Sequence, residues 1–129
     1  MTSTIFVAGG SGMVGRAIIR RLHGKGHDNV IANYHRRRPV LEGVRWHGLD
    51  LTDQRAVARF FQEQKPDYVF LAAARVGGIG ANNRYRTDFL LDNLQIQNNV
   101  IQAGWQHGVS KLLFLGSSCI YPRECPQPI

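Results

Sequence analysis

The chain has 129 residues, 43% of them hydrophobic and 19% charged, with a formal net charge of +7. This length suits one domain and is short for an enzyme with separate cofactor and substrate domains. No apolar run is long enough to span a bilayer, and the apolar start at residues 5–8 is too short for a secretory signal. The cysteines Cys119 and Cys125 match neither a metal-site spacing nor a disulfide framework. We therefore expect a soluble, cytoplasmic protein without a bound metal.

The positive charge raises nucleic acid as a partner, because neutralised phosphates dominate such binding. Most basic residues are scattered, however, and only Arg36, Arg37 and Arg38 form a run. A run of this kind is either a solvated loop or a ligand contact. We expect no nucleic-acid binding, and salt-sensitive binding of DNA or RNA through residues 36–38 is the alternative.

The first part of the chain predicts a strand, a glycine turn, a helix and a second strand. Residues 4–8 are a short, β-rich apolar run, and residues 13–22 then place apolar side chains at helical spacing. Gly24 ends this helix, and residues 30–34 have the composition of the next strand. These elements form a βαβ unit.

The middle of the chain predicts a short strand, a helix and a buried strand. Residues 44–48 follow a loop and form the short strand, and either Thr52 or Asp53 caps a helix whose apolar side includes Phe60. Residues 68–72 are a continuous apolar run, which is typical of a strand buried on both faces of a parallel sheet. We expect this strand to be central.

The last part predicts one long helix and a final strand. A glycine-rich loop at residues 76–80 precedes a helix expected over about residues 84–107, which Gly108 ends, and residues 111–115 form the strand. Strands that alternate with helices predict an α/β fold, a doubly wound parallel sheet with right-handed crossovers. We infer one domain over residues 1–129, with strand order 3-2-1-4-5 and its end after the fifth strand.

The turn between the first strand and the first helix carries a specific motif. Gly9-Gly-Ser-Gly-Met-Val-Gly15 follows a strand and opens a helix inside a βαβ unit. Its glycines would let a pyrophosphate approach the backbone, and the helix N-terminus offers free N–H groups to that charge. A turn that serves packing alone is the alternative. The motif predicts a Rossmann-type dinucleotide site that includes Gly9, Gly10, Ser11, Gly12, Met13, Val14 and Gly15.

The end of the second strand favours NADP over NAD. An acidic residue about twenty positions beyond the glycine motif would bind the adenosine ribose of NAD, and none is present. The sequence instead places Arg36 and Arg37 where a 2′-phosphate would lie, without distinguishing between them. Asp50 and Leu51, after the third strand, are expected to flank the adenine, although Asp50 equally suits a turn.

Longer strings carry a resemblance that goes beyond the glycine turn. They are Gly12-Met-Val-Gly15, Leu71-Ala-Ala-Ala-Arg-Val-Gly-Gly-Ile79 with Ala81-Asn-Asn83, and Lys111-Leu-Leu-Phe-Leu-Gly-Ser-Ser-Cys-Ile-Tyr-Pro122. Through them the whole chain resembles the extended short-chain dehydrogenase/reductase family, and within it the NADPH-dependent epimerase-reductases that make GDP-L-fucose. The resemblance implies that the segment with Ala72, Ala73 and Ala74 runs beneath the cofactor.

The same resemblance implies a reaction. GDP-4-keto-6-deoxymannose would be epimerised at C3 and C5, and its C4 ketone would then be reduced. Ser117 matches the serine that hydrogen-bonds the C4 oxygen, and Cys119 matches the epimerisation acid/base, a task that suits a thiol with a lowered pKa. On the residues alone, Ser117 also suits a strand-end turn and Cys119 a small buried apolar position.

The family's Tyr-x-x-x-Lys pair is not found among these residues, because none of the tyrosines has a lysine four positions later. We therefore expect the chain to be the N-terminal, cofactor-binding portion of a longer enzyme, inactive alone and homodimeric when complete. Two alternatives stay open. One is a standalone nucleotide-binding or regulatory module, and the other is a different nucleotide-sugar epimerase or dehydratase.

Overall fold

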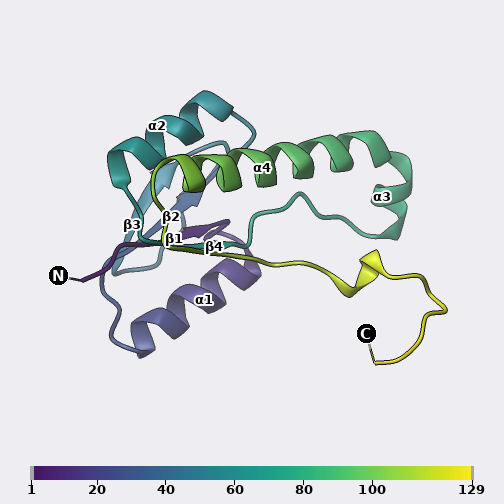
Figure 1. Ribbon diagram of the computed structural model, residues 1–129, viewed down its shortest axis with the longest axis horizontal. Coiled ribbons are helices and arrows are strands. Elements are labelled where there is room, and N and C mark those ends of the chain that lie inside the picture. The colour runs from purple at the N-terminus through teal and green to yellow at the C-terminus, as the bar shows by residue number, and fades with distance from the viewer. Residues whose placement is uncertain (1, 129) are drawn as a thin grey trace.

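The computed structural model describes residues 2–128, and within them the strands form a five-stranded parallel sheet with helices on both faces (Figure 1). The strands lie in the order β3-β2-β1-β4-β5, so the predicted Rossmann-type, doubly wound arrangement is confirmed. The strand bounds are β1 Ile5–Ala8, β2 Val30–Tyr34, β3 Val44–Gly48, β4 Tyr68–Leu71 and β5 Lys111–Phe114.

Two apolar layers hold the helices to the sheet. Helix α1 (Met13–Gly24) covers one face, while α2 (Gln54–Gln64) and α4 (Arg86–Gln106) cover the other (Figure 1). Successive side chains of a strand point to opposite faces, so in β1 Val7 packs on the α1 side and Phe6 on the α2–α4 side. This two-sided burial explains why β1 is continuously apolar and why the buried part of β2 is apolar apart from Asn33.

Helix α2 begins and packs as its sequence predicts. The side chain of Asp53 accepts a hydrogen bond from the backbone N–H of Ala56 (3.0 Å), which identifies Asp53 rather than Thr52 as the cap. The Phe60 and Phe61 rings lie 4.7 Å and 5.7 Å from the Phe6 ring, centroid to centroid. These aromatic contacts fix the helix over the centre of the sheet.

The long helix expected over about residues 84–107 is confirmed as α4, but the glycine-rich loop expected at residues 76–80 was wrong at its end. A short helix, α3 (Ile79–Arg84), precedes α4, and the two are separated at Tyr85, whose φ of −121° and ψ of 43° leave the helical region. Residues 79 and 80 therefore belong to a helix and not to the glycine-rich loop. Gly80 lowers the helical propensity of this segment, so the sequence pattern did not indicate this helix.

The fourth strand was predicted to be central and buried on both faces, and only its central place is confirmed. Strand β4 is paired on both sides, with β1 and with β5, so its central place is confirmed. Val69 and Leu71 are buried, but Tyr68 is 40% exposed and Phe70 is half-buried, because α1 does not extend over this part of the sheet. The apolar run thus has one covered face and one partly open face.

After β5 the chain leaves the sheet. The Leu115 N–H still donates to the Leu71 carbonyl (3.2 Å), and the following segment then runs away from the body of the molecule, with one short 3₁₀ turn at Ser118–Ile120 (Figure 1). Among residues 2–128, none of the helices is both long enough and apolar enough to cross a membrane.

Replacing Phe61 by alanine tests the aromatic layer beneath α2. Phe61 is fully buried, so the substitution should lower the free energy of unfolding by about 3–5 kcal/mol through lost apolar burial and a residual cavity. Urea denaturation measures this change. The control is Trp105→Ala in α4, where the side chain is 81% exposed and a change within about 0.5 kcal/mol is expected. Equal losses in both variants would contradict this packing.

Candidate functional site

The glycine turn joins β1 to α1 in a conformation that few other residues adopt. Gly9 has a φ of +84°, and its carbonyl accepts a hydrogen bond from the N–H of Gly12 (3.0 Å). Gly12 is the N-cap of α1 and makes no side-chain cap. The first N–H groups of a helix have no partner within it, so the turn directs backbone donors outward.

The glycines of the turn serve different purposes. A Cβ atom on Gly15 would lie 2.2 Å from the Gly9 carbonyl oxygen, and one on Gly10 would lie 2.6 Å from the Ala32 Cβ. These two glycines are needed for packing the helix and the strands together. A Cβ on Gly12 would meet nothing closer than 3.4 Å. Packing therefore does not require glycine at position 12, where the free space faces outward.

A buried asparagine ties the turn to the neighbouring strands. The side-chain oxygen of Asn33, at the end of β2, accepts a hydrogen bond from the Gly9 N–H (2.7 Å). Its amide nitrogen donates to the Leu49 carbonyl after β3 (3.0 Å). Asn33 is 5% exposed, and both polar ends of its amide are satisfied within the protein. One side chain thus fixes the relative positions of three strand ends.

A hollow of about 590 Å³ opens over these strand ends. Ligands of open α/β sheets bind at the carboxyl ends of the strands, where the strand order reverses, and this hollow lies between the ends of β1, β2, β3 and β4. Its lining is formed by Gly9, Ser11, Gly12, Asn33, His35, Arg36, Leu49, Asp50, Leu51, Thr52, Ala72, Ala73, Ala74, Arg75, Asp92 and Ile96.

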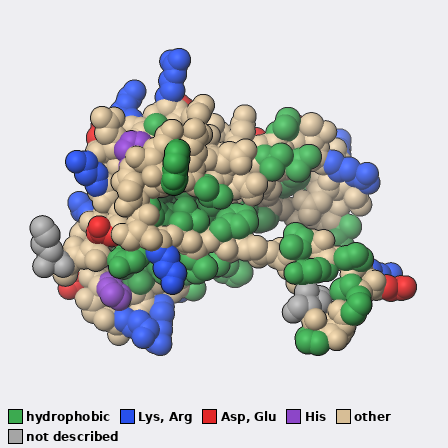
Figure 2. All heavy atoms as spheres, viewed as in Figure 1, with side chains coloured by type: hydrophobic (Ala, Val, Ile, Leu, Met, Phe, Trp, Pro, Cys, Tyr) green, Lys and Arg blue, Asp and Glu red, His purple; other side chains and the backbone are tan. Residues whose placement is uncertain are grey.

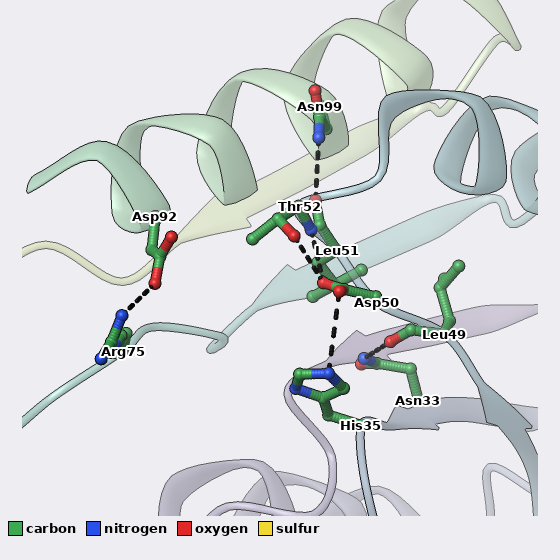
Figure 3. A network of polar contacts seen from close by, with 9 residues as sticks. All are labelled: Asn33, His35, Leu49, Asp50, Leu51, Thr52, Arg75, Asp92 and Asn99. Atoms are coloured by element: carbon green, nitrogen blue, oxygen red, sulfur yellow. Dashed lines mark hydrogen bonds and ion pairs between the residues drawn. The ribbon is translucent and has the colours of Figure 1, made fainter. Parts of the chain in front are cut away.

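The carboxylate of Asp50 carries a fixed negative charge on one wall of the hollow (Figure 3). The backbone N–H and the hydroxyl of Thr52 both donate to it, at 2.9 Å and 2.7 Å, and these bonds lower its pKa. His35 lies 3.7 Å away and adds a smaller lowering. Asp50 is therefore a turn residue that also lines the hollow, and its place beside an adenine stays a prediction.

Helix α4 contributes Asp92 and Ile96 to the lining of the hollow, and Figure 3 shows Asp92 and Asn99 on this helix. Its Asp92 forms an ion pair with Arg75, in the segment after β4. Further along the helix, the amide of Asn99 donates to the Leu51 carbonyl (2.9 Å). Two loops that line the hollow are thus both attached to α4.

The structure brings most of the predicted cofactor residues into this one hollow. Those in the lining are Gly9, Ser11, Gly12, Arg36, Asp50, Leu51, Ala72, Ala73 and Ala74. Gly10 and Gly15 lie beneath the turn instead, and Met13 and Val14 point their side chains into solvent, 86% and 45% exposed. Arg37 is exposed and is not part of the lining, so the geometry favours Arg36.

The lining also contains residues that sequence reasoning did not assign to the site. They are Asn33, His35, Leu49, Thr52, Arg75, Asp92 and Ile96. Asn33 carried a recognisable signal, because it is the one polar residue in the buried part of an otherwise apolar strand. Asp92 and Ile96 carried none, since only the packing of α4 brings them to the strand ends.

The two predicted catalytic residues lie apart from this hollow. Ser117 and Cys119 are exposed on the segment after β5, and the Ser117 hydroxyl oxygen accepts a hydrogen bond from the Cys119 N–H (3.1 Å). The structure thus pairs the two residues with each other but places neither in the lining. In the part of the chain from residue 2 to 128, no cluster of three or more His, Cys, Asp or Glu side chains is arranged to hold a metal ion.

A second hollow, of about 670 Å³, lies at the opposite, amino-terminal ends of the strands. It is mainly apolar, and Ile5, Leu22, Phe70 and Leu113 contribute to its walls. Figure 2 shows hydrophobic side chains gathered across the centre of the face drawn there. This hollow is the partly open sheet face beside α1. It lacks the glycine turn and the helix N-terminus, so we do not assign the nucleotide site to it.

The parallel sheet, the glycine turn that opens α1 and the polar hollow at the strand ends together define a Rossmann-type dinucleotide-binding class of protein. The family model of the NAD dependent epimerase/dehydratase family matches residues 5–129. The chain belongs to this family, which confirms the family predicted from the sequence.

Individual relatives make this comparison more specific. Over 99% of its length the chain is 53% identical to GDP-L-fucose synthase 1 of Arabidopsis thaliana, and over 97% it is 47% identical to the GDP-L-fucose synthase of Escherichia coli K12. It covers 36% of each of them. A solved GDP-mannoheptose C4 reductase from Campylobacter jejuni, with NADP bound, is 39% identical with a TM-score of 0.86, over 99% of this chain and 37% of that one. The chain thus spans about a third of the length of these relatives.

The charge on Asp50 can be tested by replacing Thr52 with alanine. The variant loses the hydroxyl donor and keeps the backbone donor, so the pKa of Asp50 should rise part of the way towards the usual carboxyl value. A lowered carboxyl pKa stabilises the fold above the unfolded-state pKa, and this contribution is lost as pH falls through the folded-state pKa. The variant should therefore gain less stability as pH rises from acid to neutral.

NMR titration of the Asp50 carboxyl carbon measures this change in its pKa. Thr87→Ala, at an exposed site, is the control, and an unchanged Asp50 titration in the Thr52 variant would refute the assignment.

Proposed function

We propose that these residues form the cofactor-binding part of a longer, NADPH-dependent epimerase-reductase that converts GDP-4-keto-6-deoxymannose to GDP-L-fucose. The observation that supports the cofactor assignment is that the glycine turn and Arg36 line the same hollow. The end of β2 carries no acidic residue that would favour NAD. The substrate assignment is supported by the identity to GDP-L-fucose synthases from a plant and a bacterium.

The residues of the hollow fit an NADP molecule. Gly12 leaves the turn open to a pyrophosphate, and the unpartnered N–H groups of α1 suit its negative charge. Arg36 is the residue that would pair with the 2′-phosphate, because a guanidinium binds phosphate in a bidentate manner. Asp50 and Leu51 would flank the adenine, and Ala72, Ala73 and Ala74 would line the path of the nucleotide.

When bound, NADPH supplies the reducing equivalent for the C4 ketone of the sugar. In this proposal the Ser117 hydroxyl donates a hydrogen bond to the C4 oxygen and stabilises the negative charge that develops there. Cys119 removes and returns protons at C3 and C5, which are acidic because they adjoin the ketone. Both residues follow β5, whose carboxyl end lies at the same edge of the sheet as the hollow.

The proposal requires groups that the 129 residues do not include. The Tyr-x-x-x-Lys pair of the family is not found in the sequence, and we propose that the longer protein supplies it together with the GDP-binding part. We also propose a homodimer, supported by Leu90 and Leu91 of α4, which are 59% and 53% exposed. Incubating that longer protein with GDP-4-keto-6-deoxymannose and NADPH should yield GDP-L-fucose, and failure to form it would remove the proposed activity.

Cofactor preference tests the role of Arg36. The chain should bind NADPH more tightly than NADH, and Arg36→Ala should weaken NADPH binding about tenfold through loss of a charge-assisted contact, with little effect on NADH. Fluorescence titration of both reduced cofactors measures these affinities. Arg37→Ala is the matched control, since the neighbouring arginine is exposed and lies outside the lining. Equal or tighter binding of NADH by the unmodified chain would exclude the predicted NADP specificity.

The role of Cys119 is tested in the longer protein. Replacing Cys119 by serine removes the thiol and should suppress solvent deuterium exchange at C3 and C5 of the sugar, because a hydroxyl is a much weaker acid/base near neutral pH. Mass spectrometry of the recovered nucleotide sugar measures the exchange. NADPH binding should be unaffected, and Cys125→Ser is the control. Normal exchange in the Cys119 variant would show that another residue moves these protons.

A further inference from the structure

The segment after β4 is held to α4 by a single asparagine through both of its polar atoms. The side-chain oxygen of Asn93 accepts a hydrogen bond from the Arg75 backbone N–H (2.7 Å), and its amide nitrogen donates to the Arg75 carbonyl (2.9 Å). Arg75 belongs to no strand or helix, so its backbone groups have no ladder partners. Asn93 thus supplies the donor and the acceptor that a neighbouring strand would offer to the Arg75 backbone.

The Arg75 side chain strengthens the same attachment. Its guanidinium pairs with Asp92 and lies over the Phe89 ring, 5.0 Å from the ring centroid. Gly77 also lies against this ring, since a Cβ there would be 2.9 Å from the Phe89 Cζ. The segment therefore packs against the first turns of α4, where Phe89 and Asp92 contact it from one helix face.

This attachment determines where one wall of the hollow lies. Ala72, Ala73, Ala74 and Arg75 line the hollow, and Asn93 holds the last of them. Asn99, further along the same helix, holds the opposite wall through the Leu51 carbonyl (2.9 Å). Both walls thus depend on asparagine side chains of α4.

We infer that α4 positions the walls of the nucleotide hollow, and that Asn93 is a positioning residue that sets the path of residues 73–75 along the bound cofactor. The inference rests on the proposed function, since it takes the ligand to be NADPH. An amide is required at position 93 because it donates and accepts at once. An ionised carboxylate could accept from the Arg75 N–H, but it would repel the Arg75 carbonyl.

The decisive experiment compares Asn93→Asp with Asn93→Ala by NADPH titration of the whole chain at neutral and at mildly acidic pH. Both variants should weaken binding about fivefold at neutral pH. Aspartic acid regains a donor when it is protonated, so affinity relative to the unmodified chain should recover at acidic pH for Asn93→Asp but not for Asn93→Ala. Arg75 and Asp92 are the charged groups that face this position, and both are retained in the two variants.

Asn82→Asp is the matched control, because Asn82 also donates to a carbonyl of this segment, that of Gly77 (3.2 Å), but lies outside the hollow. It should change NADPH affinity less than twofold. Native affinity in Asn93→Asp at neutral pH, or the same loss at both pH values as in Asn93→Ala, would overturn the inference.

Hydrogen exchange of the backbone amides of residues 74–77 gives a second readout that does not depend on the ligand. These amides should exchange faster in both Asn93 variants than in Asn82→Asp, and equal rates would overturn the positioning role. If the unmodified chain does not bind NADPH, the proposed cofactor is wrong, and the exchange rates alone decide whether Asn93 holds the segment.

Discussion

The close approach of α1 to β1 is the constraint on which the rest of the site depends. The Gly15 backbone lies so near the Gly9 carbonyl that no side chain fits between them. This contact sets the angle at which α1 leaves the turn, and hence where its N-terminus points. It also brings Ile19 and Leu22 down onto β1 and β2, where they form the apolar layer of that face. The packing of α1 on the sheet and the direction of its N-terminus are therefore two results of the same missing Cβ atom.

Around this turn, asparagine side chains hold the backbone in position, as hydrophobic contacts do elsewhere in the fold. The strand ends and loops of a parallel sheet leave backbone groups without ladder partners. Asn33 satisfies such groups of Gly9 and Leu49, and Asn99 satisfies one of Leu51. An amide makes directional bonds, so each contact fixes a position more narrowly than apolar burial does. The sheet supplies stability, and the asparagines supply the shape of the hollow.

The sequence was sufficient to predict the order of the strands, which follows from the alternation of strands and helices, and the location of the glycine turn, which follows from the steric needs of glycine. It was insufficient where a long-range contact decides the outcome. The open side of Phe70 depends on which neighbours are present. The hydrogen-bond partners of Asn33 are likewise set by tertiary structure. A polar residue in a buried strand, such as Asn33, thus indicates a tertiary hydrogen bond whose partner the sequence does not name.

The outer position of β5 has a consequence for the behaviour of the chain in solution. Within residues 2–128, β5 lies at the edge of the sheet, and its Leu113 and Phe114 are each 47% exposed. The free side of an edge strand can pair with another chain. The net charge of +7 opposes such encounters, but salt screens that repulsion. Colloidal stability should therefore decline as ionic strength rises.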